Sequence, residues 1–223
     1  MKFELDNVEL SFKEKRILYG VYIRAEKGRI TGILGPNGCG KTSLLRIFFG
    51  NLASNNKLVK INNKGTLKPL YSIKNIKLLS QSDLLPSSMS VSKLFKIYKI
   101  SWEDFLEKFP GFSNYRSQKP NQLSGGEKRL IAIWLTIKCE SDLVLLDEPF
   151  THLTPLYIEI IKKELVMEKK NKAILLTDHF YRDLIEITDD LYFLEKGCTR
   201  LIKDTAQLNE LGYVSSHEYS NTP

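Results

Sequence analysis

Cysteine is scarce in this sequence, and no hydrophobic run is long enough to cross a membrane. The 223 residues include three cysteines, Cys39, Cys139 and Cys198, which are odd in number and far apart. Such cysteines argue against a disulfide framework or a zinc site and fit a reducing compartment. The longest strongly apolar stretch, residues 130–137, is far shorter than the roughly 20 residues of a membrane-spanning helix. Charges in residues 1–6 argue against a signal peptide, so we expect a cytoplasmic protein that does not itself span a membrane.

Acidic residues are fewer than basic ones, 26 against 33, and the formal net charge is +7. This excess suits an anionic partner such as nucleic acid, a membrane surface or a nucleotide. The lysines are spread along the chain rather than gathered into one block, which favours the alternative of a lysine-rich solvated surface. A hydrophobic content of 42% and a charged content of 26% are typical of a folded globular protein. The length fits one domain with a small inserted subdomain.

Strand-like and helical patterns alternate along most of the chain. The expected strands are residues 3–10, 17–25, 29–34, 142–146, 173–177, 191–194 and 199–202, with three short runs between 57 and 79 that are separated by residues 62–65 and 72–75. The expected helices are residues 41–48, 91–97, 102–109, 124–139, 155–169 and 180–187. Residues 26–28 have the composition of a hairpin turn between the second and third strands, and Ser101 is expected to cap a helix. The alternation predicts a mainly parallel sheet with helices on its faces.

A glycine-rich segment follows the strand expected at 29–34. Residues 35–42, Gly-Pro-Asn-Gly-Cys-Gly-Lys-Thr, match the phosphate-loop pattern G-x-x-x-x-G-K-[ST]. Glycines let successive backbone N–H groups point at phosphate oxygens, and the following helix adds its positive dipole end. Lys41 would reach the β- and γ-phosphates, the Thr42 hydroxyl would bind Mg²⁺, and the Cys39 side chain would point away rather than act as a redox-sensitive thiol. The expected nucleotide contacts here are Gly35, Pro36, Asn37, Gly38, Cys39, Gly40, Lys41, Thr42 and Ser43.

A second apolar strand ends in two carboxylates, Asp147 and Glu148. Neighbouring side chains of a strand point in opposite directions, so the two acids need not share a role. Asp147 would hold Mg²⁺, directly or through water, and Glu148 would orient and activate the water that attacks the γ-phosphate. A solvated turn at a strand end is the alternative, and the phosphate loop upstream argues against it.

A pair of glycines opens the helix expected at 124–139. Residues 123–127, Leu-Ser-Gly-Gly-Glu, supply a serine cap and two glycines that permit close backbone approach. The helix N-terminus is therefore a second candidate site for an anion. Ser124 and Glu127 also have the spacing of a capping box, which is expected whether or not a ligand binds.

The order of these segments resembles the nucleotide-binding domain of ABC transporters. A phosphate loop, a glutamine after a strand, Leu-Ser-Gly-Gly-Glu, a strand ending in Asp-Glu, and Thr-Asp-His follow one another over residues 1–205. Leu-Ser-Gly-Gly-Glu resembles the family signature, which other phosphate-loop ATPases lack. By this resemblance Phe12 would stack on adenine and Gln81 would contact Mg²⁺ and the attacking water. His179 would contact the γ-phosphate, since an imidazole N–H can donate to a phosphate oxygen.

The resemblance also implies the fold, which is α/β with a P-loop NTPase core of the ABC ATPase type. Residues 1–81 would form the N-terminal part of this core with an antiparallel β-subdomain. Residues 82–122 would be a short inserted helical subdomain, and residues 123–212 the C-terminal part of the core. Residues 213–223 would be a flexible tail.

The implied activity is ATP hydrolysis with ATP and Mg²⁺ as the ligands. The catalytic residues would be Lys41, Gln81, Glu148 and His179, and the Mg²⁺ ligands would be Thr42, Gln81 and Asp147. The implied partners are a second ABC ATPase domain, in a homodimer or heterodimer, and a transmembrane permease that holds the protein on the inner face of the membrane. No nucleic acid is expected. In the head-to-tail dimer of the family, one chain closes over the ATP of the other with Ser124, Gly125, Gly126 and Glu127.

The segment after Asp-Glu-Pro departs from the family pattern. Residues 151–154 are Thr-His-Leu-Thr, where the family usually has Ser-Ala-Leu-Asp. Thr154 therefore replaces an aspartate in a segment that lies at the dimer interface in the family. We expect slower or less coordinated hydrolysis as a result.

Two alternatives are weighed against a transporter subunit. A soluble ATPase of the same type that acts on nucleic acid or ribosomes would suit the net charge. Ribosome-associated relatives carry two cassettes in one chain, and this sequence shows one. DNA-repair and chromosome relatives carry a long coiled-coil insertion, which the 41 residues at 82–122, with their prolines, cannot supply. A regulatory nucleotide binder that does not hydrolyse ATP is disfavoured because the catalytic residues are intact.

Overall fold

The computed structural model describes residues 1–82 and 85–213, so the predicted tail lies almost wholly outside the described residues. The strands are β1 (Lys2–Phe12), β2 (Lys15–Glu26), β3 (Ile30–Leu34), β4 (Asn56–Ile61), β5 (Lys64–Thr66), β6 (Ile76–Leu79), β7 (Leu143–Asp147), β8 (Ala173–Thr177), β9 (Asp190–Glu195) and β10 (Cys198–Ile202). The helices are α1 (Lys41–Phe49), α2 (Leu70–Ile73), α3 (Val91–Tyr98), α4 (Trp102–Lys108), α5 (Gly125–Lys138), α6 (Pro155–Glu168), α7 (Tyr181–Ile187) and α8 (Ala206–Glu210), with 3₁₀ turns at Pro110–Tyr115 and Pro120–Gln122.

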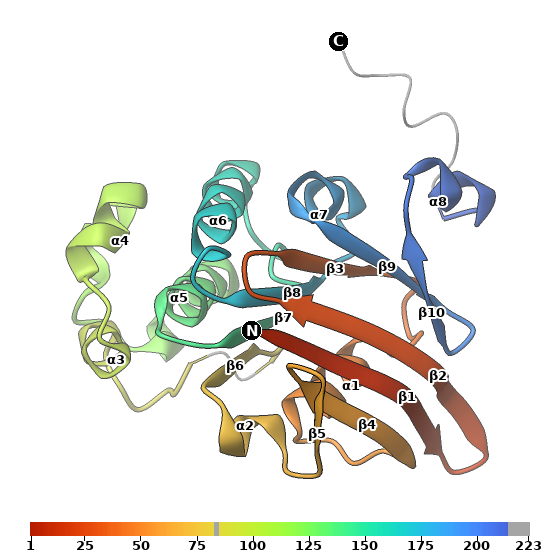
Figure 1. Ribbon diagram of the computed structural model, residues 1–223. Coiled ribbons are helices and arrows are strands. Elements are labelled where there is room, and N and C mark those ends of the chain that lie inside the picture. Colours follow the sequence, from red (N-terminus) through yellow and green to blue (C-terminus); the bar gives the residue numbers. More distant parts are fainter. Residues whose placement is uncertain (83–84, 214–223) are drawn as a thin grey trace.

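The strands form two sheets (Figure 1). The first has four antiparallel strands in the order β2-β1-β4-β5, and the second has six strands in the order β10-β9-β3-β8-β7-β6. Neighbours from β9 to β6 run parallel, and β10 joins the edge antiparallel to β9. The predicted parallel core and its antiparallel β-subdomain are therefore confirmed.

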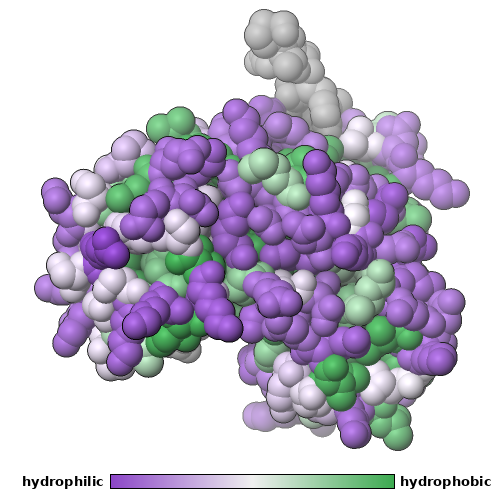
Figure 2. All heavy atoms as spheres, turned by 60° about the vertical axis from the view of Figure 1, so that its left-hand side comes forward, coloured by the Kyte–Doolittle hydropathy of each residue, from purple (hydrophilic) through white to green (hydrophobic). Residues whose placement is uncertain are grey.

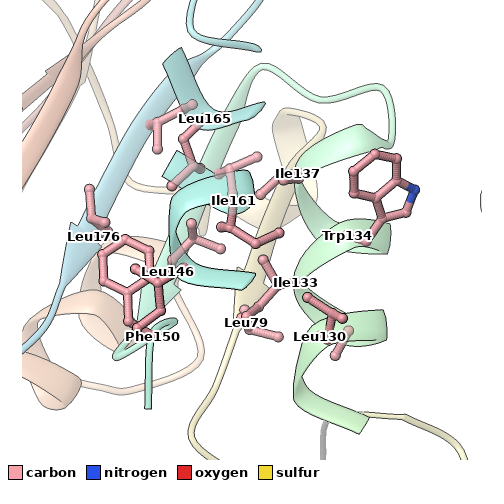
Figure 3. Packing of buried hydrophobic residues seen from close by; sticks show 14 of the residues in the cluster. Leu79, Leu130, Ile133, Trp134, Ile137, Leu146, Phe150, Ile161, Leu165 and Leu176 are labelled. Atoms are coloured by element: carbon pink, nitrogen blue, oxygen red, sulfur yellow. The ribbon is translucent and has the colours of Figure 1, made fainter. Parts of the chain in front are cut away.

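The parallel strands contribute side chains to two hydrophobic cores. Val144 and Leu146 of β7 face the core that α5, α6 and α7 cover, while Leu143 and Leu145 face the core filled by α1 and the antiparallel sheet. Neighbouring side chains of a strand point to opposite faces, so a strand buried on both faces is apolar at every position. Figure 3 shows the first core, in which apolar residues of α6 lie between those of α5 and the strand that carries Leu176.

The segment between β6 and α5 is a short helical insert that joins the first core through aromatic rings. Phe105 of α4 is fully buried, and its ring centroid lies 5.6 Å from that of Trp134 in α5. Ser101 caps α4 as predicted, because its side chain accepts the N–H of Asp104 at 3.0 Å. The insert is therefore packed directly against the helix that begins after Ser124.

The predicted hairpin between the second and third strands is wrong. The turn at 26–28 forms, with the Arg29 N–H donating to the Glu26 carbonyl at 3.0 Å. However, β2 pairs with β1, and β3 lies in the other sheet between β9 and β8. The reason is burial: all five residues of β3 are buried, so this strand needs cover on both faces, whereas β2 exposes many of its residues.

The middle strand predicted between 57 and 79 is also largely wrong. Asn62 and Asn63 both have left-handed φ angles, 49° and 66°, and form a two-residue hairpin turn, so β5 begins early and ends at Thr66. The chain then forms the helix α2 after Pro69, whose φ of −54° fits a helix start. The sequence analysis did not predict α2, α8 or the 3₁₀ turns.

The surface is mostly hydrophilic on the face shown in Figure 2, with hydrophobic residues in small separate groups. Among the described residues, every helix is too short or too polar to cross a bilayer.

Candidate functional site

The glycine-rich loop leaves β3 and enters α1, as the sequence predicts, and its shape depends on glycine. Gly40 has a φ of 109°, and a Cβ there would lie 2.9 Å from a side-chain carbon of Leu18. At Gly35 a Cβ would lie 2.2 Å from the carbonyl oxygen of Leu194. A side chain at either position would force the loop open, because φ angles in this region and such close contacts are tolerated only by glycine.

Lys41 is a buried cation at the start of α1. It is 5% exposed, and its Nζ donates to the carbonyl oxygens of Gly35 at 2.7 Å and Pro36 at 3.1 Å. Two main-chain acceptors of the loop thus hold the ammonium group beside the loop backbone. A phosphate bound there would meet a fixed positive charge as well as N–H donors.

A cleft of about 460 Å³ opens beside the loop. Within the described residues it is lined by Phe12, Ile17, Asn37, Gly38, Gly40, Lys41, Thr42, Ser43, Gln81, Glu148 and His179. The structure therefore brings together residues that are up to 167 positions apart and that the sequence analysis had selected from separate motifs. Ile17 is the one lining residue in this set that was not predicted. Gly35 and Pro36 do not line the cleft, but their carbonyl oxygens accept hydrogen bonds from Lys41 Nζ.

Asp147 lies beneath the cleft at the end of β7. Its side chain is almost fully buried, and it accepts hydrogen bonds from the hydroxyls of Thr42 and, at 2.9 Å, Thr177. Burial raises the pKa of the Asp147 carboxyl, and the two hydroxyl donors oppose that rise. The predicted Mg²⁺ ligands Thr42 and Asp147 are thus in direct contact, and Gln81 lines the same cleft. Hydroxyl, carboxylate and amide oxygens are a donor set that fits Mg²⁺.

Glu148 is the next residue, and its carboxylate faces the cleft. Its backbone has a left-handed φ of 50°. For a residue with a side chain this conformation costs roughly 1–3 kcal/mol, and it persists only where the surroundings hold it. Its N–H donates to the carbonyl oxygen of Thr177 at 2.9 Å. Its Oε2 lies 3.6 Å from Nδ1 of His179. The two neighbouring acids therefore occupy different environments, as the strand geometry predicts.

Asp178 is a residue of the site that the sequence analysis missed. It is fully buried, and its carboxylate accepts the N–H of Phe150 at 2.9 Å and that of Phe180 at 3.0 Å. Burial raises the pKa of the Asp178 carboxyl, and the N–H donors oppose that rise. The carboxylate thus ties the segment after Glu148 to the residues around His179. The Thr-Asp-His sequence contained this signal.

The Leu-Ser-Gly-Gly-Glu segment opens α5 with the predicted capping box. The Ser124 N–H donates to Glu127 Oε2 at 2.7 Å, and the Glu127 N–H donates to Ser124 Oγ at 3.3 Å. The hydroxyl of Tyr115, in the helical insert, donates to the other carboxylate oxygen of Glu127 at 2.5 Å, a contact that was not predicted. None of residues 124–127 lines the phosphate-loop cleft in the described structure. Gly125 instead lines a second cleft, of about 360 Å³, which also shares Gln81 and Glu148.

Cys39 is half-buried within the phosphate loop. Its side chain packs against the core formed by α1 and the antiparallel sheet, and it is not among the described residues that line the cleft. Burial raises the pKa of the thiol, although the nearby Lys41 opposes this, so the reactive thiolate is disfavoured. The orientation agrees with the sequence expectation.

Comparison with known proteins identifies the family. Residues 18–151 match the family model described as ABC transporter. The probable branched-chain amino acid transport ATP-binding protein LivF of Archaeoglobus fulgidus is 30% identical over 201 residues, which cover 83% of this chain and 85% of that protein. The uncharacterized ABC transporter ATP-binding protein YybJ of Bacillus subtilis is 31% identical over 196 residues, which cover 83% and 89%.

Solved structures show the same fold. A bacterial Atm1-family ABC exporter with ATP bound superposes with a TM-score of 0.81 at 18% identity, over 100% of this chain and 42% of that one. MJ1267, an ATP-binding cassette of an ABC transporter, superposes with a TM-score of 0.72 at 26% identity, over 88% of each chain. ATPases of this family bind ATP, generally with Mg²⁺, and hydrolyse it. The chain belongs to the ABC transporter family and is an ATP-binding subunit with a P-loop NTPase core of the ABC ATPase type.

Proposed function

We propose that this chain binds and hydrolyses ATP as the motor subunit of a membrane transporter, that it pairs with a second ATPase domain when ATP binds, and that this pairing drives a permease. The observation that carries the proposal is the phosphate-loop cleft, where Lys41, Thr42, Gln81, Glu148 and His179 meet. Each of these side chains has a distinct chemical use in phosphoryl transfer to water. The relatives named above are ATP-binding proteins of transport systems, which supports a transporter over a nucleic-acid enzyme.

The residues of the cleft would divide the work as follows. Lys41 and the loop N–H groups would bind the phosphates, and Phe12, which is half-exposed at the edge, would stack on the adenine. Glu148 would accept a proton from the attacking water and orient it, with Gln81 as a second acceptor or donor. His179, 3.6 Å from Glu148, would donate a hydrogen bond to the γ-phosphate.

Thr42, Asp147 and Gln81 would hold Mg²⁺, which would neutralise the charge that develops on the phosphate oxygens. The buried carboxylate of Asp147 supports this assignment, because a buried charge is stable only when it is paired or bound to a metal.

Residues 124–127 would act on the ATP of the second subunit. Ser124 and Gly125 are exposed at the N-terminus of α5, and within one chain they do not reach the phosphate-loop cleft. A second chain with the same exposed helix N-terminus would complete the site, because such N-termini attract phosphate. The subunit would then lie in the cytoplasm, peripheral on the inner face of the membrane through its permease.

The test uses the full chain and its Glu148→Gln variant, which should bind ATP but hardly hydrolyse it. We expect this variant to form a dimer with ATP and Mg²⁺, and to remain monomeric with ADP, in light scattering after size exclusion. Lys41→Ala is the control, because it removes the phosphate contact and should abolish the dimer. Wild-type turnover per subunit should rise with protein concentration. A Glu148→Gln variant that stays monomeric at saturating ATP, or turnover independent of concentration, would contradict the proposal.

The permease is tested separately. Crosslinking in cells, followed by purification of the tagged chain, should recover an integral membrane protein. Recovery of RNA or ribosomes in its place would favour the soluble alternative.

A further inference from the structure

A buried arginine, Arg129, forms hydrogen bonds with the ends of both β6 and β7. It lies in the second turn of α5 and is 3% exposed. Its Nη1 donates to the carbonyl oxygen of Ser80 at 2.7 Å, and its Nη2 donates to the carbonyl oxygens of Asp147 at 2.5 Å and Glu148 at 2.7 Å. One guanidinium group thus holds the backbone just after β6 and the backbone at the end of β7.

These acceptors belong to the residues that carry the proposed hydrolysis. Ser80 directly precedes Gln81, and the Glu148 carbonyl is part of the left-handed backbone that directs the Glu148 side chain into the cleft. A residue with a side chain stays in that conformation only if its surroundings hold it. The Glu148 N–H is held by Thr177, and its carbonyl is held by Arg129. Loss of the guanidinium would leave the Glu148 carbonyl with only the longer hydrogen bond from the Thr151 N–H, at 3.3 Å.

Arg129 also connects these strand ends to the Leu-Ser-Gly-Gly-Glu segment. It lies four positions after Gly125, on the same rigid helix. Figure 3 shows the helix packed along its length, with Leu130, Ile133 and Ile137 directed at the core that contains Leu79 and Leu146. A displacement of the N-terminus of α5 would therefore move the guanidinium and the two strand ends together.

The charges around the guanidinium group favour its hydrogen bonds to the two strand ends. Burial lowers the pKa of Arg129, while the carboxylates of Asp147, Asp178 and Glu148 oppose that change. Arginine remains protonated under all ordinary conditions, so these acids face a permanent positive charge. A planar guanidinium can also donate to both strand ends at once, whereas a lysine ammonium is a compact point charge.

We infer that Arg129 is a positioning residue for ATP hydrolysis. Its hydrogen bonds to the backbone fix the positions of Gln81 and Glu148 relative to each other, and they connect both residues to the Leu-Ser-Gly-Gly-Glu segment at the start of α5. The inference rests on the proposed function. Arg129 lies outside the described lining of the phosphate-loop cleft but lines the second cleft with Gln81, Gly125 and Glu148. Because its side chain is 3% exposed and donates to three main-chain carbonyls, the inferred role is positioning rather than contact with nucleotide. Its removal should therefore change the turnover number and leave nucleotide binding intact.

The test compares Arg129→Gln with a matched control, Lys172→Gln. Lys172 is also 3% exposed, and its Nζ donates to two main-chain carbonyls, those of Ile137 at 2.6 Å and Cys139 at 2.9 Å, at the far end of the same helix. Both variants lose a buried cation and its carbonyl contacts, and Lys172→Gln also loses an ion pair with Glu168 at 3.1 Å, so a purely structural effect should be at least as large in the control. We expect Arg129→Gln to lower kcat by about tenfold to a hundredfold, as a misplaced catalytic group does, with KM and the equilibrium affinity for an ATP analogue within about twofold of wild type. Lys172→Gln should retain kcat within about twofold.

A double-mutant cycle with Glu148→Gln separates positioning from a general loss of structure. If Arg129 acts through Glu148 as well as Gln81, adding Arg129→Gln to Glu148→Gln should lower the single-turnover rate by a smaller factor than in the wild-type background, because only the contribution through Gln81 remains. An additive loss equal to that in the wild-type background would overturn the inference. Arg129→Lys should give an intermediate kcat, because one ammonium cannot donate to both strand ends in the same geometry.

The outcomes distinguish this inference from the proposed function. A wild-type chain without ATP turnover would overturn both. A wild-type chain that turns over ATP, with Arg129→Gln equal to Lys172→Gln in kcat, would overturn only the role of Arg129. Should Arg129→Gln fail to fold, as judged by circular dichroism, Arg129→Lys decides the matter, and wild-type turnover in that variant would overturn the inference.

Discussion

Replacing Gly126 by alanine should destabilise the protein, whereas the same change at Gly125 should stabilise it. Both glycines lie in the first turn of α5, and neither has a positive φ angle, so alanine fits both backbones. A Cβ at Gly125 would meet no atom within 4 Å, but a Cβ at Gly126 would lie 2.7 Å from the carbonyl oxygen of His152. That distance is 0.7 Å shorter than the 3.4 Å at which ordinary contact begins, and the obstacle is backbone rather than a flexible side chain.

The magnitudes follow from two opposing effects. A Gly→Ala change at a compatible backbone stabilises by about 0.4–1 kcal/mol, because the unfolded chain loses freedom. Forcing extra volume into a packed site costs about 1–3 kcal/mol. Gly125→Ala has only the stabilising effect on the unfolded chain, whereas Gly126→Ala has that effect and the clash. The free energies of unfolding of the two variants should therefore differ by the cost of the clash, about 1–3 kcal/mol.

Urea or guanidinium unfolding at equilibrium measures this difference directly, provided that the m-values of the variants agree. In thermal unfolding each kcal/mol corresponds to roughly 2–4 °C in Tm for a chain of this size. Gly125→Ala should nevertheless impair ATP turnover, since Gly125 is exposed at the helix N-terminus that is proposed to approach the partner's phosphates. If Gly126→Ala proves as stable as Gly125→Ala, the packing of the residue 151–154 segment against the signature helix is not as described.

Four further changes test other parts of the site. Glu148→Gln should lower ATP turnover by about a hundredfold or more while ATP binding persists, which single-turnover and equilibrium binding assays would separate; comparable turnover would remove Glu148 from its role. Asp178→Asn leaves one of two backbone N–H groups facing an amide NH₂, so it should cost about 1–3 kcal/mol in chemical unfolding, and an unchanged stability would contradict the buried bonds. Phe12→Ala should weaken ATP binding by about tenfold through lost stacking and leave Tm unchanged, because the ring is half-exposed; equal affinity would argue against adenine stacking. Thr154→Asp should raise the rate or cooperativity of ATP hydrolysis, and no gain in either would contradict the expectation of impaired coordination.

The sequence predicted the elements whose residues carry their own local signal. The phosphate loop was found from its glycines, β7 and β8 from continuous apolar residues, and α5 from its capping box. The partition of strands between sheets was not predictable in this way. The chain at 26–28 turns as a hairpin would, and only the burial of β3 on both faces decides that it enters the parallel sheet. That burial is a property of the whole fold rather than of the turn.

The residues that support the site were harder to find than those that line it. Phe12, Gln81 and His179 were selected through the resemblance to the ABC family, and the cleft brings them together. Asp178 and Arg129 bind main-chain atoms of distant segments, and a backbone carbonyl or N–H has no signature in the sequence. For Asp178 the Thr-Asp-His sequence was a signal, whereas Arg129 follows Glu127 and Lys128 and only the structure shows that it, and not its neighbours, is buried.

We expect the Thr154 substitution to affect the pairing of two subunits rather than the fold of the single chain. The conformation of the segment is set by other residues, since His152 has a left-handed φ of 66° and its carbonyl packs against Gly126. Thr154 is exposed at the N-cap of α6, where its side chain caps no described N–H group. An aspartate there would add a helix cap worth at most about 1 kcal/mol and would leave the packing as it is. Because the variant leaves the packing of the single chain as it is, a large effect of Thr154→Asp on hydrolysis would favour a role of this exposed side chain in the proposed contact with a second subunit.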